Sequence, residues 1–367
     1  MTDFRDQIET AVNRWVKPEV RKLKAYHVPD AEGYVKLDAM ENPFVWPDAI
    51  QQEWLKELAS AEINRYPDAD SKALKQGIAE VMSVPEGIEM ILGNGSDELI
   101  QLIAMAVNGA NRKIMAPEPS FVMYQMVAKY IDMDYVGIPL NDDFGIDLEA
   151  TLRQIEIEDP AVIFLAQPNN PTGNLWGDEK LRCILEAANG LVVIDEAYTA
   201  FTEADYLSWL ESYPNLLIMR TFSKIGLAGL RLGVLFGHSS WIAEINKLRL
   251  PYNINVLTQK SALFALQHYQ VLINQTQELI SQRQRLFKLL DDIDGLKSYP
   301  SQANFILVRA AQGQGAVIHA ALKERNILVK NLHGAHPSLS DCLRITVSNS
   351  AENDLLIAAL RDICSAS

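Results

Sequence analysis

The stretch of sequence that decides the fold is residues 220–233, which read RTFSKIGLAGLRLG. It lies between the apolar runs 216–219 and 232–236, which we expect to form buried strands. Lys224 would then sit on a loop between core elements, where desolvation lowers the pKa of an amine. A neutral amine can form a Schiff base, so this lysine is the first candidate for a catalytic group.

The neighbours of Lys224 indicate what it would hold. Thr221 and Ser223 supply hydroxyl groups, and Arg231 supplies a guanidinium that can bind two oxygens at once. The segment can therefore bind a phosphate close to the lysine. Together these residues predict a lysine that holds a phosphorylated aldehyde.

The region around this stretch alternates short apolar runs with amphipathic stretches, which is typical of a mostly parallel sheet covered by helices. We therefore predict an α/β fold. In such sheets ligands bind at the carboxyl ends of the strands. The predicted strands span residues 113–116, 134–138, 161–165, 191–195, 217–220 and 233–236.

Beyond the predicted sheet, the sequence indicates a long helical region followed by a second domain. The helical region runs from Thr258 to about Leu290, and residues 298–301 mark a break. A length of 367 residues suits one large domain with a smaller one attached. The second domain is predicted to contain strands at 304–308 and 342–347 and helices near 316–325 and 353–363.

Composition restricts the partners. A formal net charge of −14 without a Lys/Arg block argues against nucleic acid or an anionic membrane surface. The first residues lack the apolar core of a signal peptide, and no apolar run is long enough to span a membrane, so we expect a cytoplasmic protein. The three cysteines have no metal-site spacing, and His333 and His336 lie in a predicted loop, so no metal site is indicated.

Asp195 closes the apolar run 191–194, and Tyr198 follows three residues later. A carboxylate at the end of a buried strand needs a cationic partner. One interpretation is a helix N-cap or a metal ligand. The other is that Asp195 holds a protonated ring nitrogen while Tyr198 donates a hydrogen bond to an oxygen of the same ring.

Two turn segments are further candidates for contributing to this site. Residues 167–173, QPNNPTG, form a constrained turn from which the amide of Asn170 can reach the site of Asp195. Residues 93–99, GNGSDEL, form a glycine-rich turn that leads into a helix over 99–106, which Ser96 can cap. This segment is interpreted either as a well-capped helix or as a phosphate site at a helix start, and it does not match a dinucleotide-binding motif.

Eight segments, taken in order along nearly the whole chain, resemble fold-type I pyridoxal-phosphate aminotransferases, and most closely the histidinol-phosphate aminotransferase group. Such a fold has a large domain with a mostly parallel sheet, expected over residues 46–290. It also has a small α+β domain, expected over 291–367 together with an N-terminal arm of residues 1–45. The matching segments are Glu41-Asn42-Pro43, Arg65-Tyr66-Pro67-Asp68, residues 93–98, Pro119-Ser120-Phe121 followed by Tyr124, residues 169–173, residues 195–198, Ser223-Lys224 and residues 342–347.

The resemblance implies a role for each matching residue toward pyridoxal 5′-phosphate. Lys224 would form the Schiff base and later move a proton, and Asp195 would pair with the pyridine nitrogen. Asn170 and Tyr198 would bond the ring oxygen, and Phe121 would stack on the ring. The phosphate would be held by Ser96, Asp97, Thr221, Ser223, Arg231 and, from a second subunit, Tyr66, which implies a homodimer.

The substrate site is implied in the same way. Arg344 matches the arginine that binds the substrate anion, and Lys330 stands where relatives commonly have a second arginine. Tyr26 resembles an N-terminal tyrosine that reaches the substrate, and Asn42 is a candidate for contacting the substrate or its lid.

The resulting prediction is transamination between L-histidinol phosphate and 2-oxoglutarate in histidine biosynthesis. The main alternative is an aromatic amino-acid aminotransferase, since both need an aromatic slot and an anion-binding group. A phosphothreonine-type decarboxylase and a non-catalytic protein that binds the cofactor are further alternatives. Assays with each substrate and the absorbance of bound cofactor discriminate among them.

Overall fold

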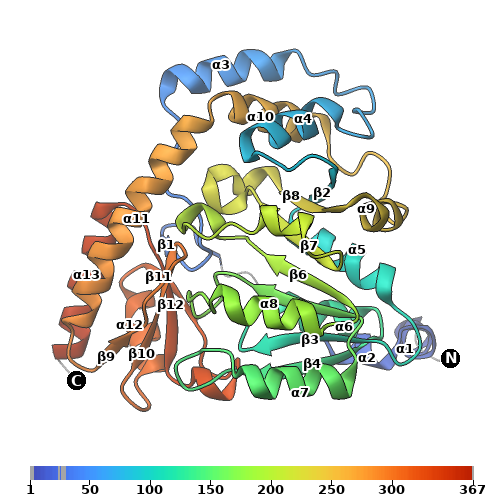
Figure 1. Cartoon of the computed structure of the whole chain (residues 1–367). Helices are drawn as coiled ribbons and strands as arrows, with labels where there is room; N and C mark the ends of the chain where they lie inside the picture. Colours follow the sequence, from blue (N-terminus) through green and yellow to red (C-terminus); the bar gives the residue numbers. More distant parts are fainter. Residues whose placement is uncertain (1–3, 24, 26–29, 366–367) are drawn as a thin grey trace.

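A computed structural model describes residues 4–23, 25 and 30–365 (Figure 1). Its larger sheet has seven strands in the order β2-β8-β7-β6-β5-β3-β4. Strand β8 runs antiparallel to both of its neighbours, and the other pairs are parallel, which confirms the predicted α/β class. The strands are β2 (Ile88–Asn94), β3 (Lys113–Glu118), β4 (Asp134–Pro139), β5 (Val162–Ala166), β6 (Leu191–Asp195), β7 (Leu216–Thr221) and β8 (Leu232–His238).

Alternate residues of the central strands enter two separate hydrophobic clusters, one on each face of the sheet. In β5, Ile163 and Leu165 belong to one cluster, and Val162 and Phe164 belong to the other. A strand buried on both faces reads as a continuous apolar run, which explains why the sequence revealed it.

Helices cover both faces. Residues of α5 (Ser96–Val107), α6 (Met123–Tyr130) and α9 (Ser239–Asn246) join the cluster on one face. The cluster on the other face draws on α4 (Lys72–Met82), α7 (Leu148–Glu158), α8 (Asp178–Ala187) and α10 (Val256–Gln267). Helix α3 (Asp48–Ala59) lies outside α10 and α4 (Figure 1).

A second sheet has five strands in the order β1-β11-β12-β10-β9. It combines one strand from the N-terminal region with four strands from the C-terminal region. Strand β1 pairs in parallel with β11, and the remaining pairs are antiparallel. Helices α12 (Gly315–Glu324), α13 (Ser350–Ser365) and the second half of α11 (Tyr269–Asp291) supply its core. The strands are β1 (Val35–Leu37), β9 (Leu296–Ser298), β10 (Phe305–Ala310), β11 (Ile327–Asn331) and β12 (Cys342–Thr346). The predicted domain boundaries at 45/46 and 290/291 stay a prediction.

Two local predictions were wrong. The helical region predicted from Thr258 to Leu290 is broken at His268, where α10 ends and α11 begins one residue later. Helix α5 begins at Ser96 and has Gly95 as its N-cap without a side-chain hydrogen bond, so Ser96 does not cap it. Near the N-terminus, α1 (Phe4–Trp15) is followed by α2 (Pro18–Lys22), which contacts α6.

Candidate active site

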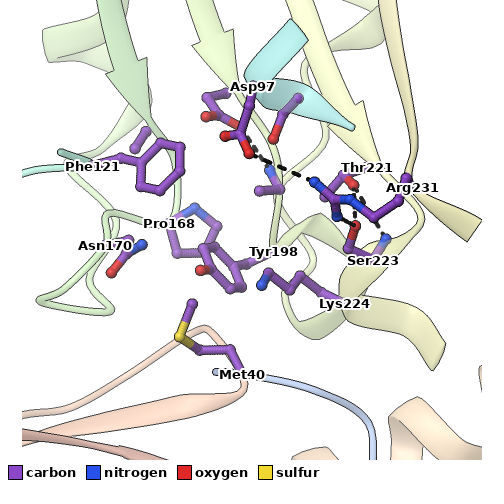
Figure 2. Close-up of a pocket in the computed structure, with 14 residues that line it drawn as sticks. Met40, Asp97, Phe121, Pro168, Asn170, Tyr198, Thr221, Ser223, Lys224 and Arg231 are labelled. Atoms are coloured by element: carbon purple, nitrogen blue, oxygen red, sulfur yellow. Dashed lines mark hydrogen bonds and ion pairs between the residues drawn. The ribbon is translucent and has the colours of Figure 1, made fainter. Parts of the chain in front are cut away.

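Most of the predicted functional side chains gather in one cavity of about 560 Å³ at the carboxyl ends of the parallel strands (Figure 2). This is the position at which open α/β sheets bind ligands. Its walls come from the start of α5, from the segments that follow β3, β5, β6 and β7, and from the N-terminal segment. The lining residues are Met40, Ser96, Asp97, Phe121, Ala166, Pro168, Asn170, Asp195, Ala197, Tyr198, Thr221, Ser223, Lys224 and Arg231.

Asp195 is the last residue of β6 and is only 3% exposed. The Tyr124 hydroxyl donates a hydrogen bond of 2.7 Å to its Oδ2, and the Ala197 backbone N–H donates one of 3.1 Å to its Oδ1. Burial raises the pKa of Asp195 to about 6 against the opposing effect of these two bonds. Since both donors are neutral, the carboxylate is suited to a cationic ligand atom in the cavity.

Lys224 lies in the short helical segment Ser223–Leu227, directly after β7. Its Nζ donates a hydrogen bond of 3.3 Å to the backbone oxygen of Ala39 and lies 5.9 Å from the centre of the Tyr198 ring. Burial, followed by the positive charge of Arg344, lowers the pKa of Lys224 to about 8. The lowered pKa predicted from the sequence is confirmed, and the amine can act as a nucleophile or a base near neutral pH.

Two aromatic residues flank the cavity. Tyr198 is 4% exposed, and burial is the largest cause that raises the pKa of its hydroxyl, so the hydroxyl stays protonated and can donate a hydrogen bond. Phe121 faces the interior from the other side of the cavity (Figure 2), with its ring edge-on to Tyr124 at a centroid distance of 5.6 Å. A flat ring placed between these walls would meet an apolar face and a hydroxyl donor.

Polar groups suited to an anion lie at one end of the cavity. The Thr221 hydroxyl donates to the Ser223 hydroxyl at 2.9 Å, and Nη1 of Arg231 lies 3.5 Å from the same Ser223 oxygen. Nη2 of Arg231 forms an ion pair of 3.6 Å with Asp97 in the first turn of α5 (Figure 2). Hydroxyls, a guanidinium and the N-terminus of a helix together favour a phosphate.

Gly95 makes room for this arrangement. It has a φ of +80°, and a Cβ at this position would lie 2.7 Å from Nη2 of Arg231. Arg231 itself has a left-handed φ of +50°, which is unusual for a residue with a side chain. The backbone on both sides is thus held in uncommon conformations that bring the guanidinium to the start of α5.

Asn170 is oriented by the small sheet. Nη1 of Arg344 donates a hydrogen bond of 2.6 Å to Oδ1 of Asn170, and Nη2 donates one of 2.9 Å to the backbone oxygen of Asp38. With its oxygen engaged, Asn170 presents its amide N–H groups to a ligand oxygen in the cavity.

A second cavity of about 1070 Å³ adjoins the first and shares Met40, Phe121 and Asn170 with it. Lys330 and Arg344 line this cavity and are paired directly opposite each other on strands β11 and β12. Residues directly opposite in an antiparallel pair lie on the same face of the sheet. Two cationic side chains therefore serve one cavity, as the predicted anion site requires.

Two predicted residues, Asn42 and Tyr66, do not line either cavity, and a third is not among the described residues. Asn42 donates to the Ile225 backbone oxygen at 3.1 Å and to Gln275 at 3.0 Å, and it is not among the lining residues of the two cavities. Tyr66 is 80% exposed on the surface, where it stacks on Tyr252 at a centroid distance of 4.5 Å. Tyr26 lies outside the described residues.

The histidine pair has local partners. Nδ1 of His333 accepts a hydrogen bond of 3.2 Å from the Asp341 backbone N–H, and Nδ1 of His336 lies 2.7 Å from the Ser338 hydroxyl. His336 also lines the second cavity. Within residues 4–23, 25 and 30–365, no group of three His, Cys, Asp or Glu side chains could hold a metal ion.

Sequence reasoning missed Met40, which lines both cavities. It has a left-handed φ of +54°, its N–H donates to the Thr346 hydroxyl at 3.0 Å, and its carbonyl accepts from the Asn304 amide at 2.9 Å. Nothing in its immediate sequence signals this role, because both partners lie more than 260 residues away in the chain. Tyr124 was noted as part of a motif, but its contact with Asp195 was not foreseen.

Comparison with known proteins identifies the family of this chain. The family model of class I and II aminotransferases matches residues 32–360, and the chain belongs to that family.

Similar proteins within the family share a single name. The chain is 49% identical over 350 residues to histidinol-phosphate aminotransferase 2 of Nitrosococcus oceani, which covers 95% of this chain and 97% of the relative. It is 46% identical to histidinol-phosphate aminotransferase of Chromobacterium violaceum, over 96% of this chain and 99% of the relative. The crystal structure of histidinol-phosphate aminotransferase from Sinorhizobium meliloti in complex with pyridoxal-5′-phosphate superimposes with a TM-score of 0.84 at 25% identity, over 96% of this chain and 98% of that one.

Proposed function

We propose that this chain is a pyridoxal-phosphate-dependent aminotransferase that transfers the amino group of L-histidinol phosphate to 2-oxoglutarate in histidine biosynthesis. The products would be imidazole acetol phosphate and L-glutamate. The observation that carries the proposal is the adjacency of two cavities, one lined by Lys224 and the buried Asp195, the other lined by Lys330 and Arg344. The shared name of relatives at 43% to 49% identity supports it.

The residues present fit pyridoxal phosphate. Asp195 is a buried carboxylate whose hydrogen-bond donors are both neutral, as a pyridinium nitrogen would require. The groups around Ser223 match a phosphate, and the free N–H groups of Asn170 together with the Tyr198 hydroxyl match a ring oxygen. When bound, the cofactor supplies an aldehyde that exchanges amines and a ring that withdraws electrons from the reacting carbon. The residues that would hold it are Ser96, Asp97, Phe121, Asn170, Asp195, Tyr198, Thr221, Ser223, Lys224 and Arg231, with Tyr66 from a second subunit.

Lys224 would move the proton. With a pKa of about 8, its Nζ is neutral in an appreciable fraction of molecules near neutral pH and accepts a proton readily. Nζ would take this proton from the amine-bearing carbon of the substrate and pass it on to the cofactor, not back to the same carbon. Asp195, ionised beside the position of the ring nitrogen, would favour a protonated nitrogen there.

Arg344 and Lys330 would orient the substrate. The phosphate of histidinol phosphate and a carboxylate of glutamate are both anions, so one cationic site has to accept either group. Arg344 is held by two hydrogen bonds, to Asn170 and to the Asp38 backbone, so its guanidinium has a fixed direction. A fixed guanidinium positions an anion better than a mobile one does, because less side-chain entropy is lost on binding.

The same proposal includes a homodimer in which Tyr66 reaches the partner's cofactor. Its support is the exposure of a large amphipathic side chain outside its own cavity, with Val45, Ile63 and Leu250 also more than 70% exposed. Light scattering of the purified protein tests the dimer. A monomer at assay concentrations would contradict it.

We also propose a cytoplasmic location. In the described ranges 4–23, 25 and 30–365, no helix is both long and apolar enough to cross a membrane. Fractionation of cells that produce the tagged protein tests the location.

The decisive experiment is a coupled assay with L-histidinol phosphate and a panel of aromatic amino acids. We expect the highest kcat/KM for L-histidinol phosphate. A far higher value for phenylalanine or tyrosine would instead identify an aromatic amino-acid aminotransferase. Visible absorbance of bound cofactor that is unaltered by every amino donor would indicate a non-catalytic protein.

A further inference from the structure

The wall of the second cavity carries an acidic side chain that the proposed function does not use. Glu118 is the last residue of β3 and lines this cavity together with Tyr135 of β4. Among the lining residues of this cavity it is the one acid, whereas Lys330 and Arg344 are cations and His336 is titratable. A carboxylate here would repel the phosphate or carboxylate group that the two cations attract, so its presence needs another explanation.

The carboxyl group of Glu118 occupies space that the absence of a side chain at Gly137 leaves open. A Cβ at Gly137, on the neighbouring strand β4, would lie 2.2 Å from Oε2 and 2.3 Å from Cδ of Glu118. Any larger residue at position 137 would therefore displace the carboxyl group. Burial together with the negative charge of Glu118 raises the pKa of the Tyr135 hydroxyl, so the hydroxyl keeps its proton. A protonated Tyr135 can donate a hydrogen bond to Glu118, which would restrain the carboxylate at the cavity wall.

A carboxylate has acceptor sites on both oxygens, so the bond from Tyr135 leaves capacity for a ligand donor. Of the candidate substrates, histidinol phosphate carries a ring N–H, and a phenyl ring carries none. A site built to accept a hydrogen bond rejects a ligand that lacks the donor, because the ligand then covers the acceptor and excludes water without pairing with it.

We propose that Glu118 determines specificity by accepting a hydrogen bond from the imidazole N–H of the substrate, while Lys330 and Arg344 bind its phosphate. This inference rests on the proposed function and adds to it the group that separates an imidazole from a phenyl side chain. Tyr135 and Gly137 are positioning residues for the carboxylate. None of the three touches the reacting atoms in this arrangement, so their effects belong to ligand selection.

The test compares L-histidinol phosphate with L-phenylalaninol phosphate, which differs only in its ring. The ratio of their kcat/KM values is measured for the wild type, Glu118→Gln, Glu118→Ala and Tyr135→Phe. We expect Glu118→Gln to lower the ratio about tenfold and Glu118→Ala to lower it further, because a charge-assisted bond is lost. The loss should lie in KM for L-histidinol phosphate, and Tyr135→Phe should lower the ratio by a smaller factor.

Glu156→Gln is the matched control, since it removes the same charge from an exposed position on α7. It should leave both values unchanged. A second readout avoids turnover: dissociation constants of both phosphates are measured by calorimetry on Lys224→Ala protein with and without Glu118→Gln. The binding preference should fall by the same factor as the kcat/KM ratio.

If the kcat/KM ratio of Glu118→Gln stayed within twofold of the wild-type ratio, the proposed role of Glu118 would be overturned and the proposed function would not. An equal loss for both substrates would also overturn it, because it would show a structural role for the carboxyl group. If the wild type itself did not turn over L-histidinol phosphate, the proposed function would fail, and the role of Glu118 would fail with it.

Discussion

The hydroxyl of Tyr124 donates a 2.7 Å hydrogen bond to Oδ2 of Asp195, from the first turn of α6 to the end of β6. Tyr124 is fully buried, and its ring stacks on Phe164 at a centroid distance of 4.7 Å. The position of the donor is therefore fixed by packing. Burial raises the pKa of Asp195, and the hydrogen bond from Tyr124 is one of the two that lower it.

We expect Tyr124→Phe to lower kcat/KM by about tenfold or more, since a hydrogen bond to a charged group contributes about 1.5–3 kcal/mol. Losing the donor raises the pKa of Asp195 above its value of about 6, so less of the carboxylate is ionised at neutral pH. Affinity for pyridoxal phosphate should fall, and the fall should be larger at pH 6 than at pH 8. Titration of the apoprotein at both pH values measures it.

The control for this variant is Tyr130→Phe, which removes the same hydroxyl from an exposed position on the same helix. It should leave affinity and its pH dependence unchanged. Equal affinity in Tyr124→Phe and the wild type at both pH values would contradict the role of the Tyr124 hydroxyl.

A second prediction concerns the pH dependence of cofactor attachment. The pKa of Lys224 lies near 8 instead of its ordinary 10.5, so the neutral, reactive fraction of the amine decreases progressively below pH 8 and predominates above it. The rate at which apoprotein takes up pyridoxal phosphate should rise about tenfold per pH unit below pH 8 and level off above it. Stopped-flow absorbance between pH 6 and 10 measures this rate, and a profile that levelled off only above pH 10 would show an ordinary lysine. Lys224→Ala should give no borohydride-stable attachment.

A third prediction tests the space at the phosphate end. In Gly95→Ala, the new methyl group would lie 2.7 Å from Nη2 of Arg231 and displace the guanidinium. We expect the dissociation constant for pyridoxal phosphate to rise about tenfold, the effect of losing one charge-assisted bond. Calorimetry on the apoprotein measures the constant.

Gly87→Ala separates this effect from backbone strain. Gly87 has a nearly identical φ of +81°, but a Cβ there meets nothing within 4 Å. Both variants should lose unfolding free energy, on the order of 1–3 kcal/mol, because a residue with a Cβ is strained at a positive φ. If Gly87→Ala weakened cofactor binding as much as Gly95→Ala did, displacement of Arg231 would not be the cause.

A fourth prediction uses subunit mixing to locate Tyr66. Tyr66→Ala and Lys224→Ala proteins should each be nearly inactive alone. If Tyr66 serves the partner's site, a mixed dimer contains one site with both residues intact, and an equal mixture should recover about a quarter of wild-type activity. Activity is assayed after subunits are exchanged in mild denaturant. If Tyr66 acted within its own chain, no site in the mixture would be intact and nothing would be recovered.

The parts of the fold predicted well are those whose signal is local. Strands β5 and β6 are buried on both faces, so their residues are apolar without interruption, and Asp195 stands out as the first charge after such a run. Lys224 stands out between β7 and β8 because hydroxyl groups and Arg231 accompany it on the connecting segment. The strands and Asp195 were found because burial alone determines the residue types.

Other features depend on contacts distant in sequence. The break at His268 has no glycine or proline to signal it, and it separates α10, which packs in the core of the large sheet, from α11, whose second half packs under the small sheet. Glu118 and Tyr135 become neighbours only because β3 and β4 pair in parallel register. Neither relationship can be obtained from local periodicity.

The pairing of β1 with β11 has a consequence for the order of synthesis. Residues 35–37 leave the ribosome 292 residues before their partners at 327–329, while all seven strands of the large sheet are complete by residue 238. The large sheet can therefore form on the nascent chain, whereas β1 must wait for the C-terminal strands. Because Met40 and the Asp38 backbone are held by those late strands, the cavity closes as one of the last events of folding.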